Sequence, residues 1–149
     1  MKSRHIGFDW TDNHQLLCDK LILQHKWSSK LYKTGEWVFP ISSNNMHLFE
    51  PLFDKIQQTV EEMCPKIDIM MRTAWVYVAN SQRNQQTYHN HSSVERDIST
   101  VFYMKKPADG GISFVDYEYN PKEGELIVFP ATTTHMPLAT TSDEYRIAI

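Results

Sequence analysis

The sequence has little cysteine and no long apolar run, and both absences narrow the class of protein. Cys18 and Cys64 are the only cysteines, with no CxxC pair, so we expect two reduced structural thiols in preference to one disulfide. No stretch approaches the roughly 20 apolar residues of a membrane span. The basic start of the chain is not followed by the apolar segment of a signal peptide. We therefore expect a cytoplasmic protein.

Clustered positive charge is also absent, which argues against a large nucleic-acid interface. The net charge is −3 at pH 7, and Lys105–Lys106 is the only adjacent basic pair. A nucleic-acid substrate held by few contacts is still compatible with this pattern. The 149 residues correspond to a single domain, and 41% apolar with 12% aromatic residues is typical of a globular chain.

The spacing of apolar residues changes once, from helical to strand-like. Up to residue 66 it predicts a short strand within residues 1–10, a helix over 11–27, an irregular stretch over 28–43 and a helix over 46–63. Beyond that it predicts strands at 70–79, 87–91, 98–105, 112–119, 126–129, 135–139 and 144–149. No helix separates these strands, so we expect antiparallel pairing in a barrel or jelly roll. The expected class is α+β, mainly β, with residues 1–66 supporting a core over 67–149.

Three histidines in this second part suggest a metal site. His89 and His91 lie one residue apart on a predicted strand, so both side chains point to the same face. His135 follows the apolar run that ends at Phe129–Pro130, where a sheet can return the chain to the same place. Imidazoles grouped in this way are typical ligands of transition metals. The alternative is that these rings face solvent or pair with carboxylates.

Charged residues near these histidines have two interpretations each. Arg146 comes eleven positions after His135 in an apolar run. It is either a surface arginine paired with an acid such as Glu144, or a bidentate clamp for a carboxylate inside the barrel. Glu95 and Asp97 share the parity of the two strand histidines, so either is an alternative metal ligand if the strand continues. The serines after His91 favour a loop there instead.

Six pieces of the second half occur in a familiar order. They are Tyr88–His91, Ser99–Met104, Gly110–Gly111, Pro121–Pro130, His135 and Arg146. Together they resemble the catalytic barrel of the 2-oxoglutarate/Fe(II)-dependent oxygenases, above all the prolyl-4-hydroxylase-like branch. The likeness runs over Thr87–Ile149, and the helical first half fits as the support packed on such a barrel.

The resemblance implies a double-stranded β-helix, a jelly-roll and cupin-like fold that holds Fe(II). The family decarboxylates 2-oxoglutarate to succinate with O₂ and hydroxylates a C–H bond of its substrate. His89 and His135 are then metal ligands, Arg146 binds the distal carboxylate of 2-oxoglutarate, and Tyr103 adds a hydrogen bond to it. The resemblance does not fix the substrate, which is open between a protein side chain, a nucleobase and a small molecule.

One position departs from the family. His91 stands where the family has a carboxylate ligand, and a third neutral ligand leaves the metal with one more positive charge. The site is then a working three-histidine site of His89, His91 and His135, a site completed by one of the two carboxylates, or a barrel without catalysis. Three hypotheses follow: a 2-oxoglutarate-dependent dioxygenase, a cupin-like three-histidine dioxygenase that does not use 2-oxoglutarate, and a non-catalytic jelly-roll module, for instance in a virus particle.

Overall fold

Two helices and nine strands make up the part of the chain that the structure describes. It is a computed structural model, and it describes residues 1–6, 11–32, 36–41, 43–66, 69–70, 73–81 and 87–149. The elements are β1 (Lys2–His5), α1 (Thr11–Tyr32), β2 (Glu36–Ile41), a 3₁₀ turn η1 (Met46–Leu48), α2 (Glu50–Met63), β3 (Ala74–Ala79), β4 (Ile98–Lys105), β5 (Ile112–Phe114), β6 (Glu118–Tyr119), β7 (Glu125–Pro130), β8 (His135–Pro137) and β9 (Arg146–Ala148). The predicted class, mainly β with two helices, is confirmed.

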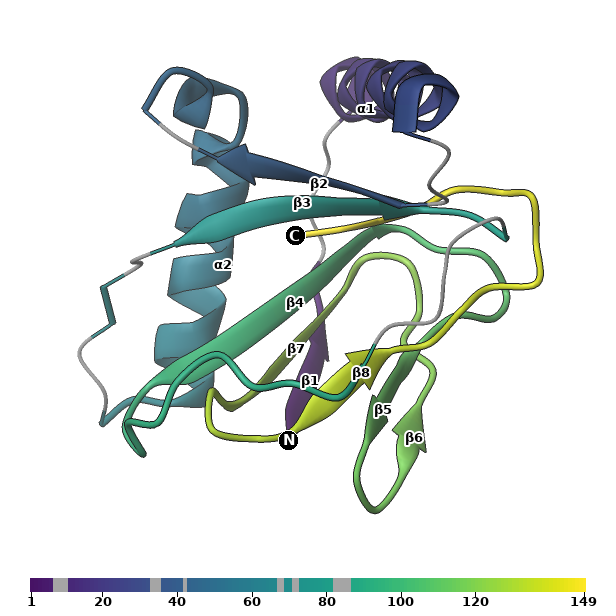
Figure 1. The fold of residues 1–149 in the computed structure, drawn as a ribbon. Helices are drawn as coiled ribbons and strands as arrows, with labels where there is room; N and C mark the ends of the chain where they lie inside the picture. The colour runs from purple at the N-terminus through teal and green to yellow at the C-terminus, as the bar shows by residue number, and fades with distance from the viewer. Residues whose placement is uncertain (7–10, 33–35, 42, 67–68, 71–72, 82–86) are drawn as a thin grey trace.

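The strands form two antiparallel sheets (Figure 1). The large sheet has six strands in the order β1-β7-β4-β9-β3-β2, and the small sheet has three in the order β6-β5-β8. An isolated bridge between His89 and His135 places the segment 87–91 along the other edge of β8. The antiparallel pairing expected from the lack of intervening helices is therefore correct.

The two faces of the large sheet have different partners because side chains alternate along each strand. One face packs against both helices in a core made of Leu17, Leu21, Leu52, Val60, Val76, Val78, Phe102, Met104, Leu126, Val128 and Ile147, among others. The other face carries Tyr103, Ile127, Phe129 and Ala148, which pack with Ile112 and Phe114 of the small sheet. The space between the sheets is thus a second apolar core.

The first half of the chain differs most from the predicted elements. The first strand is Lys2–His5, while Phe8 and Trp10 of the predicted strand lie outside the described residues. The first helix extends five residues past the predicted end, to Tyr32. A strand, β2, replaces the irregular chain expected there, and Pro40 fits within it because β2 is an edge strand that leaves the missing N–H unopposed. The helix predicted over 46–63 is divided into the 3₁₀ turn η1 and α2, which begins at Glu50 with proline in its first turn and ends at Met63 as predicted.

In the second half the predicted strands are mostly present but several are shorter. The strand over 98–105 is confirmed, whereas the one over 70–79 is limited to β3. The predicted strand over 112–119 is wrong as a single element, because the chain turns at Phe114–Tyr117 and forms the hairpin of β5 and β6. The segment 87–91 is not a full strand: it forms an isolated β-bridge at His89.

Two further features bear on the sequence-based expectations. Cys18 is buried and Cys64 half-buried, and both are free cysteines. Burial raises the pKa of the Cys18 thiol to about 11, so that thiol stays protonated and unreactive at neutral pH. Within the described ranges, neither helix combines the length and apolar character needed to cross a lipid bilayer.

Candidate metal centre

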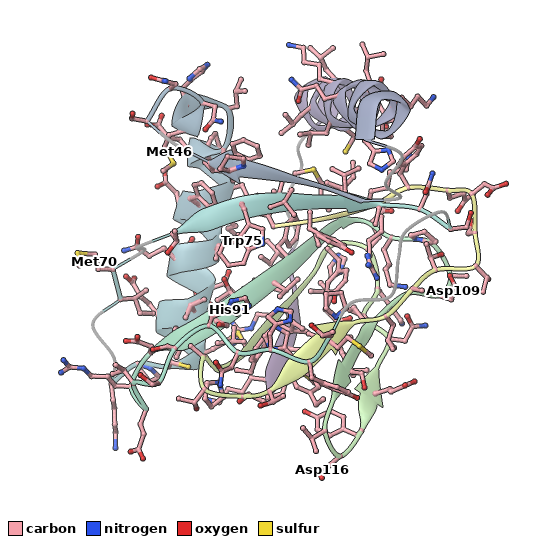
Figure 2. The ribbon with its side chains drawn as sticks, viewed as in Figure 1. Met46, Met70, Trp75, His91, Asp109 and Asp116 are labelled. Atoms are coloured by element: carbon pink, nitrogen blue, oxygen red, sulfur yellow. The ribbon has the colours of Figure 1, made fainter. Side chains whose placement is uncertain are left out.

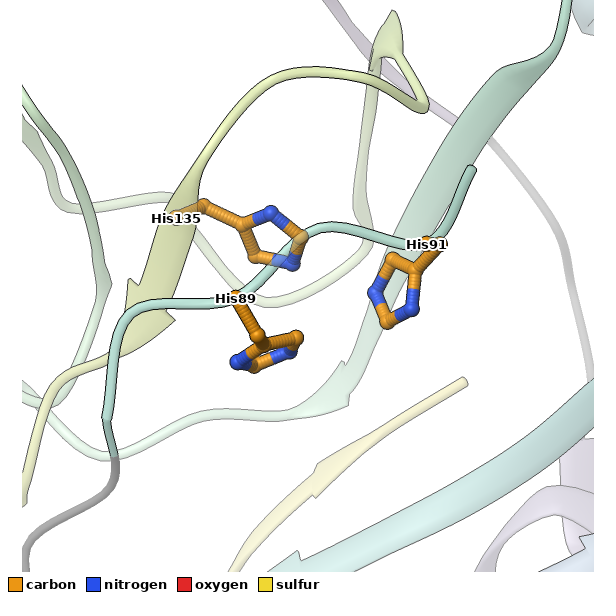
Figure 3. A group of neighbouring side chains, drawn as sticks. All are labelled: His89, His91 and His135. Atoms are coloured by element: carbon orange, nitrogen blue, oxygen red, sulfur yellow. The ribbon is translucent and has the colours of Figure 1, made fainter. Parts of the chain in front are cut away.

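His89, His91 and His135 form one cluster beside the small sheet (Figure 3). One nitrogen of each imidazole lies within 4.8 Å of the corresponding nitrogens of the other two rings. The ring centroids are 4.7 to 5.1 Å apart. A metal–nitrogen bond is about 2.0–2.1 Å long, so two such ligands on one ion lie up to about 4 Å apart. Small side-chain rotations therefore suffice for all three rings to bind one ion.

Backbone pairing explains why the three rings meet. His89 and His135 exchange both backbone hydrogen bonds, each 2.9 Å long, so they are directly opposed residues of an antiparallel pair with side chains on one face. The N–H of His91 donates to the carbonyl oxygen of Ala131 at 3.0 Å. This bond holds His91 beside the loop that leads into β8 and His135. The shared face of His89 and His91 and the return of His135 were both predicted from the sequence, and the structure brings them together.

Hydrogen bonds fix which nitrogen two of the rings present. Nδ1 of His89 lies 3.0 Å from the carbonyl oxygen of Thr87, and Nδ1 of His135 lies 2.9 Å from that of Thr133. A carbonyl oxygen only accepts, so Nδ1 carries the proton in each neutral ring and Nε2 keeps its lone pair. Such a contact to the second nitrogen is the usual support of a metal-binding histidine.

The environment favours the neutral form that a metal requires. The pKa of His91 is lowered to about 4, first because part of its ring is withdrawn from water and then because charge on His135 and His89 would repel its own. Burial also lowers the pKa of His135 against the opposing effect of the Thr133 contact, and the ring of Phe129 lies 4.9 Å from it, centroid to centroid. Both rings are uncharged at neutral pH, so a metal ion has no proton to displace from them.

The two carboxylates considered as alternative ligands lie outside this cluster. Asp97 accepts a hydrogen bond of 2.7 Å from the Ser92 hydroxyl, and Glu95 is exposed. Among the described residues, the group able to share one ion contains only the three histidines. The geometry thus favours His91 over either carboxylate as the third ligand.

Arg146 is buried inside the domain and already has protein partners. Its side chain is 1% exposed, and its Nη1 donates to the carbonyl oxygens of Gly110, Leu138 (2.6 Å) and Gly111 (3.4 Å). The guanidinium also lies over the ring of Tyr77, 5.2 Å from its centroid. Gly110 has φ of +80°, and a Cβ there would lie 3.2 Å from Nη1, so glycine lets the guanidinium approach this turn. Arg146 is therefore not a surface arginine.

Tyr103 shares a face of the large sheet with Arg146. It pairs with Ala148 across β4 and β9, and Ala148 lies two residues from Arg146, so the three side chains point the same way. Burial raises the pKa of the Tyr103 hydroxyl well above its ordinary value, against the opposing effect of the Arg146 charge. The hydroxyl is thus a neutral hydrogen-bond donor at any physiological pH.

Two contributions to the site were not found from the sequence. The carbonyl oxygens that orient two of the histidines belong to the backbone, which carries no residue-type signal. Trp75 on β3 lies with its ring centroid 5.2 Å from that of His91, and its only sequence signal was its place in an aromatic strand. A cavity of about 350 Å³ lies elsewhere, lined by Lys105, Lys106, Pro107, Glu123, Glu144 and Tyr145, and includes none of the histidines.

Comparison with known proteins adds no assignment. No protein-family model and no curated protein matches the sequence. The chemistry therefore follows from the residues themselves. Three imidazole nitrogens suit iron, copper, nickel or zinc and leave further coordination positions for other ligands. The cluster can hold a metal ion of this group.

Proposed function

We propose that this protein is an Fe(II)-dependent dioxygenase that uses 2-oxoglutarate and hydroxylates a C–H bond of its substrate. The observation that carries the proposal is the cluster of His89, His91 and His135, with Nδ1 of two rings bonded to backbone carbonyls. Imidazole is a suitable ligand for Fe(II), and three of them leave positions open for a co-substrate. The order and spacing of these residues, which resemble the 2-oxoglutarate oxygenases, support the choice of iron.

We also propose that the fold is a double-stranded β-helix of the jelly-roll, cupin-like kind. From β3 onward the chain alternates between the sheets: β3 in the large sheet, segment 87–91 beside the small one, β4 in the large, β5 and β6 in the small, β7 in the large, β8 in the small and β9 in the large. A double-sheet jelly roll winds in this way. On this proposal, β1, β2 and the helices are additions to the outside of the barrel.

The protein's own residues have distinct parts in this reaction. The bound metal supplies the activation of O₂ when 2-oxoglutarate is present. Arg146 binds the distal carboxylate of 2-oxoglutarate, and the Tyr103 hydroxyl donates a second hydrogen bond to it. Burial of both side chains supports these parts, because a charge-assisted hydrogen bond is stronger away from water. Contacts from Nη1 to backbone carbonyls hold the guanidinium in one orientation before the co-substrate arrives.

A second candidate is a three-histidine dioxygenase that binds its substrate directly and does not use 2-oxoglutarate. Two observations favour it. Nη1 of Arg146 is engaged by three backbone carbonyls, which is a structural role in its own right. The third metal ligand is the neutral His91 in place of a carboxylate, so a divalent ion keeps its full charge and attracts an anionic substrate.

An anaerobic titration of apo-protein with Fe(II), then with 2-oxoglutarate, tests the proposal. We expect a visible charge-transfer band from the chelated co-substrate, and succinate once O₂ is admitted. His89→Ala abolishes both signals, whereas Asn90→Ala, on the opposite face of the same segment, retains them. Iron binding without the band or succinate would move the assignment to the second candidate. No iron binding by the wild-type protein would leave a non-catalytic module.

A further inference from the structure

The three histidines of the cluster are not held equally well. The rings of His89 and His135 are each fixed by a hydrogen bond from Nδ1 to a backbone carbonyl. Among the described residues, no such bond fixes the ring of His91, whose side chain is exposed. A metal ligand that can rotate loses freedom on binding, and affinity falls with that loss. Some other contact has to orient this ring if the site binds a metal tightly.

Trp75 is placed to supply that contact (Figure 2). It lies two residues before Tyr77, which pairs with Ala148 of β9, so Trp75 is on the face of the large sheet that is turned to the small sheet. Its ring centroid is 5.2 Å from that of His91, with 58° between the ring planes. Aromatic pairs attract one another at centroid separations of about 4.5–7 Å.

Trp75 is the one residue of β3 that is exposed. Trp75 is 38% exposed and belongs to neither of the two apolar cores. Leaving part of so large an apolar side chain in water forgoes the gain that full burial brings. By contrast, Val76 and Val78 on the same strand are fully buried against the helices. The ring contact of Trp75 with His91 is therefore an interaction that neither apolar core accounts for.

We propose that Trp75 is a positioning residue of the metal centre, whose indole packs against the His91 imidazole and holds it ready to bind the ion. This inference rests on the metal site of the proposed function. It predicts that replacing Trp75 lowers metal affinity only when His91 is present. A residue that only supports the sheet would weaken the site whether or not His91 is present.

Co(II) binding to the purified full chain, measured by calorimetry, provides the test. Trp75→Leu lowers the affinity about tenfold or more, the range seen when a contact behind a metal ligand is removed. Trp75→Phe keeps an aromatic ring and stays close to wild type. Tyr117→Leu is the matched control, because Tyr117 is also an exposed aromatic residue, at 47%, but its ring stacks on Phe114 and not on a metal-binding histidine. In a His91→Ala background, Trp75→Leu causes no further loss.

Fluorescence gives a readout that does not depend on the leucine variant folding. The chain has four tryptophans, and Co(II) quenches most strongly the one beside it. Saturating Co(II) should quench wild-type emission by a larger fraction than that of Trp75→Phe. Equal quenching in both proteins, or equal affinity in Trp75→Leu and wild type, overturns the part given to Trp75 and leaves the proposed function standing. Absence of Co(II) and Fe(II) binding in wild type overturns both.

Discussion

Replacing Arg146 by methionine should cost more stability than any other single arginine replacement in the described residues. The side chain is 1% exposed, and Nη1 carries two hydrogens that are used on the carbonyls of Gly110 and Leu138, with a longer contact to Gly111. A hydrogen bond from a charged group contributes about 1.5–3 kcal/mol, so the two short ones contribute about 3–6 kcal/mol. Part of this loss is offset, because the methionine variant no longer has to bury a charge. We expect a net loss of about 3 kcal/mol.

Urea unfolding followed by circular dichroism measures this loss. For a domain of this size the slope is about 2 kcal/mol per molar urea, so a loss of about 3 kcal/mol moves the midpoint down by about 1.5 M. Arg4→Met is the control, because Arg4 pairs with Glu62 at 2.6 Å with both side chains about half exposed. Breaking such a surface pair costs about 0–1 kcal/mol. A midpoint for Arg146→Met that matches the one for Arg4→Met would refute the structural role assigned to the buried guanidinium.

Three further outcomes test other parts of the structure. The pKa of Asp109 is lowered to about 2, first by the hydrogen bond from the Thr140 hydroxyl, so its carboxylate stabilises the fold above about pH 4 and loses this effect as pH falls towards 2. In Asp109→Asn the free energy of unfolding should therefore fall less between pH 4 and pH 2 than in wild type, by about 1 kcal/mol or less because the group is partly exposed. Gly111→Ala would place a Cβ 2.1 Å from the Tyr119 carbonyl oxygen, so thermal melts should show a loss of about 1–3 kcal/mol, and an unchanged melting temperature would contradict the hairpin geometry. Zn(II) at 100 times the wild-type Kd should raise the free energy of unfolding of the wild-type protein by about 2.7 kcal/mol. A similar rise in His91→Ala at the same Zn(II) concentration would show that His91 is not a ligand.

The sequence was sufficient for those parts of the site that depend on strand parity. His89 and His91 share a face because they are two residues apart on extended chain, and His135 joins them because it starts the next strand of the same small sheet. The strand over 98–105 was predicted with correct ends because a long β-branched and aromatic run admits no other element.

Elements set by their place in the sheet could not be predicted. Pro40 indicated irregular chain, yet it pairs with Trp75 because β2 is the edge strand and needs no second row of hydrogen bonds. The turn between Phe114 and Tyr117 has neither glycine nor proline within it, and Asp116 is the one turn-favouring residue there, so the sequence marked it only weakly. The hydrogen bonds of the buried Arg146 are to main-chain oxygens, which carry no residue-type signal.

The central position of β9 has a consequence for how the chain folds. β9 pairs with β3 on one side and β4 on the other, so without it the large sheet consists of two separate pieces. Other pairings also join distant residues, such as Lys2 with Val128. Contacts of such long range make folding slow, on the order of milliseconds to seconds. During synthesis the edges of β3 and β4 that face each other stay unpaired until β9 has been made, and pairing them with β9 is also the step that buries Arg146.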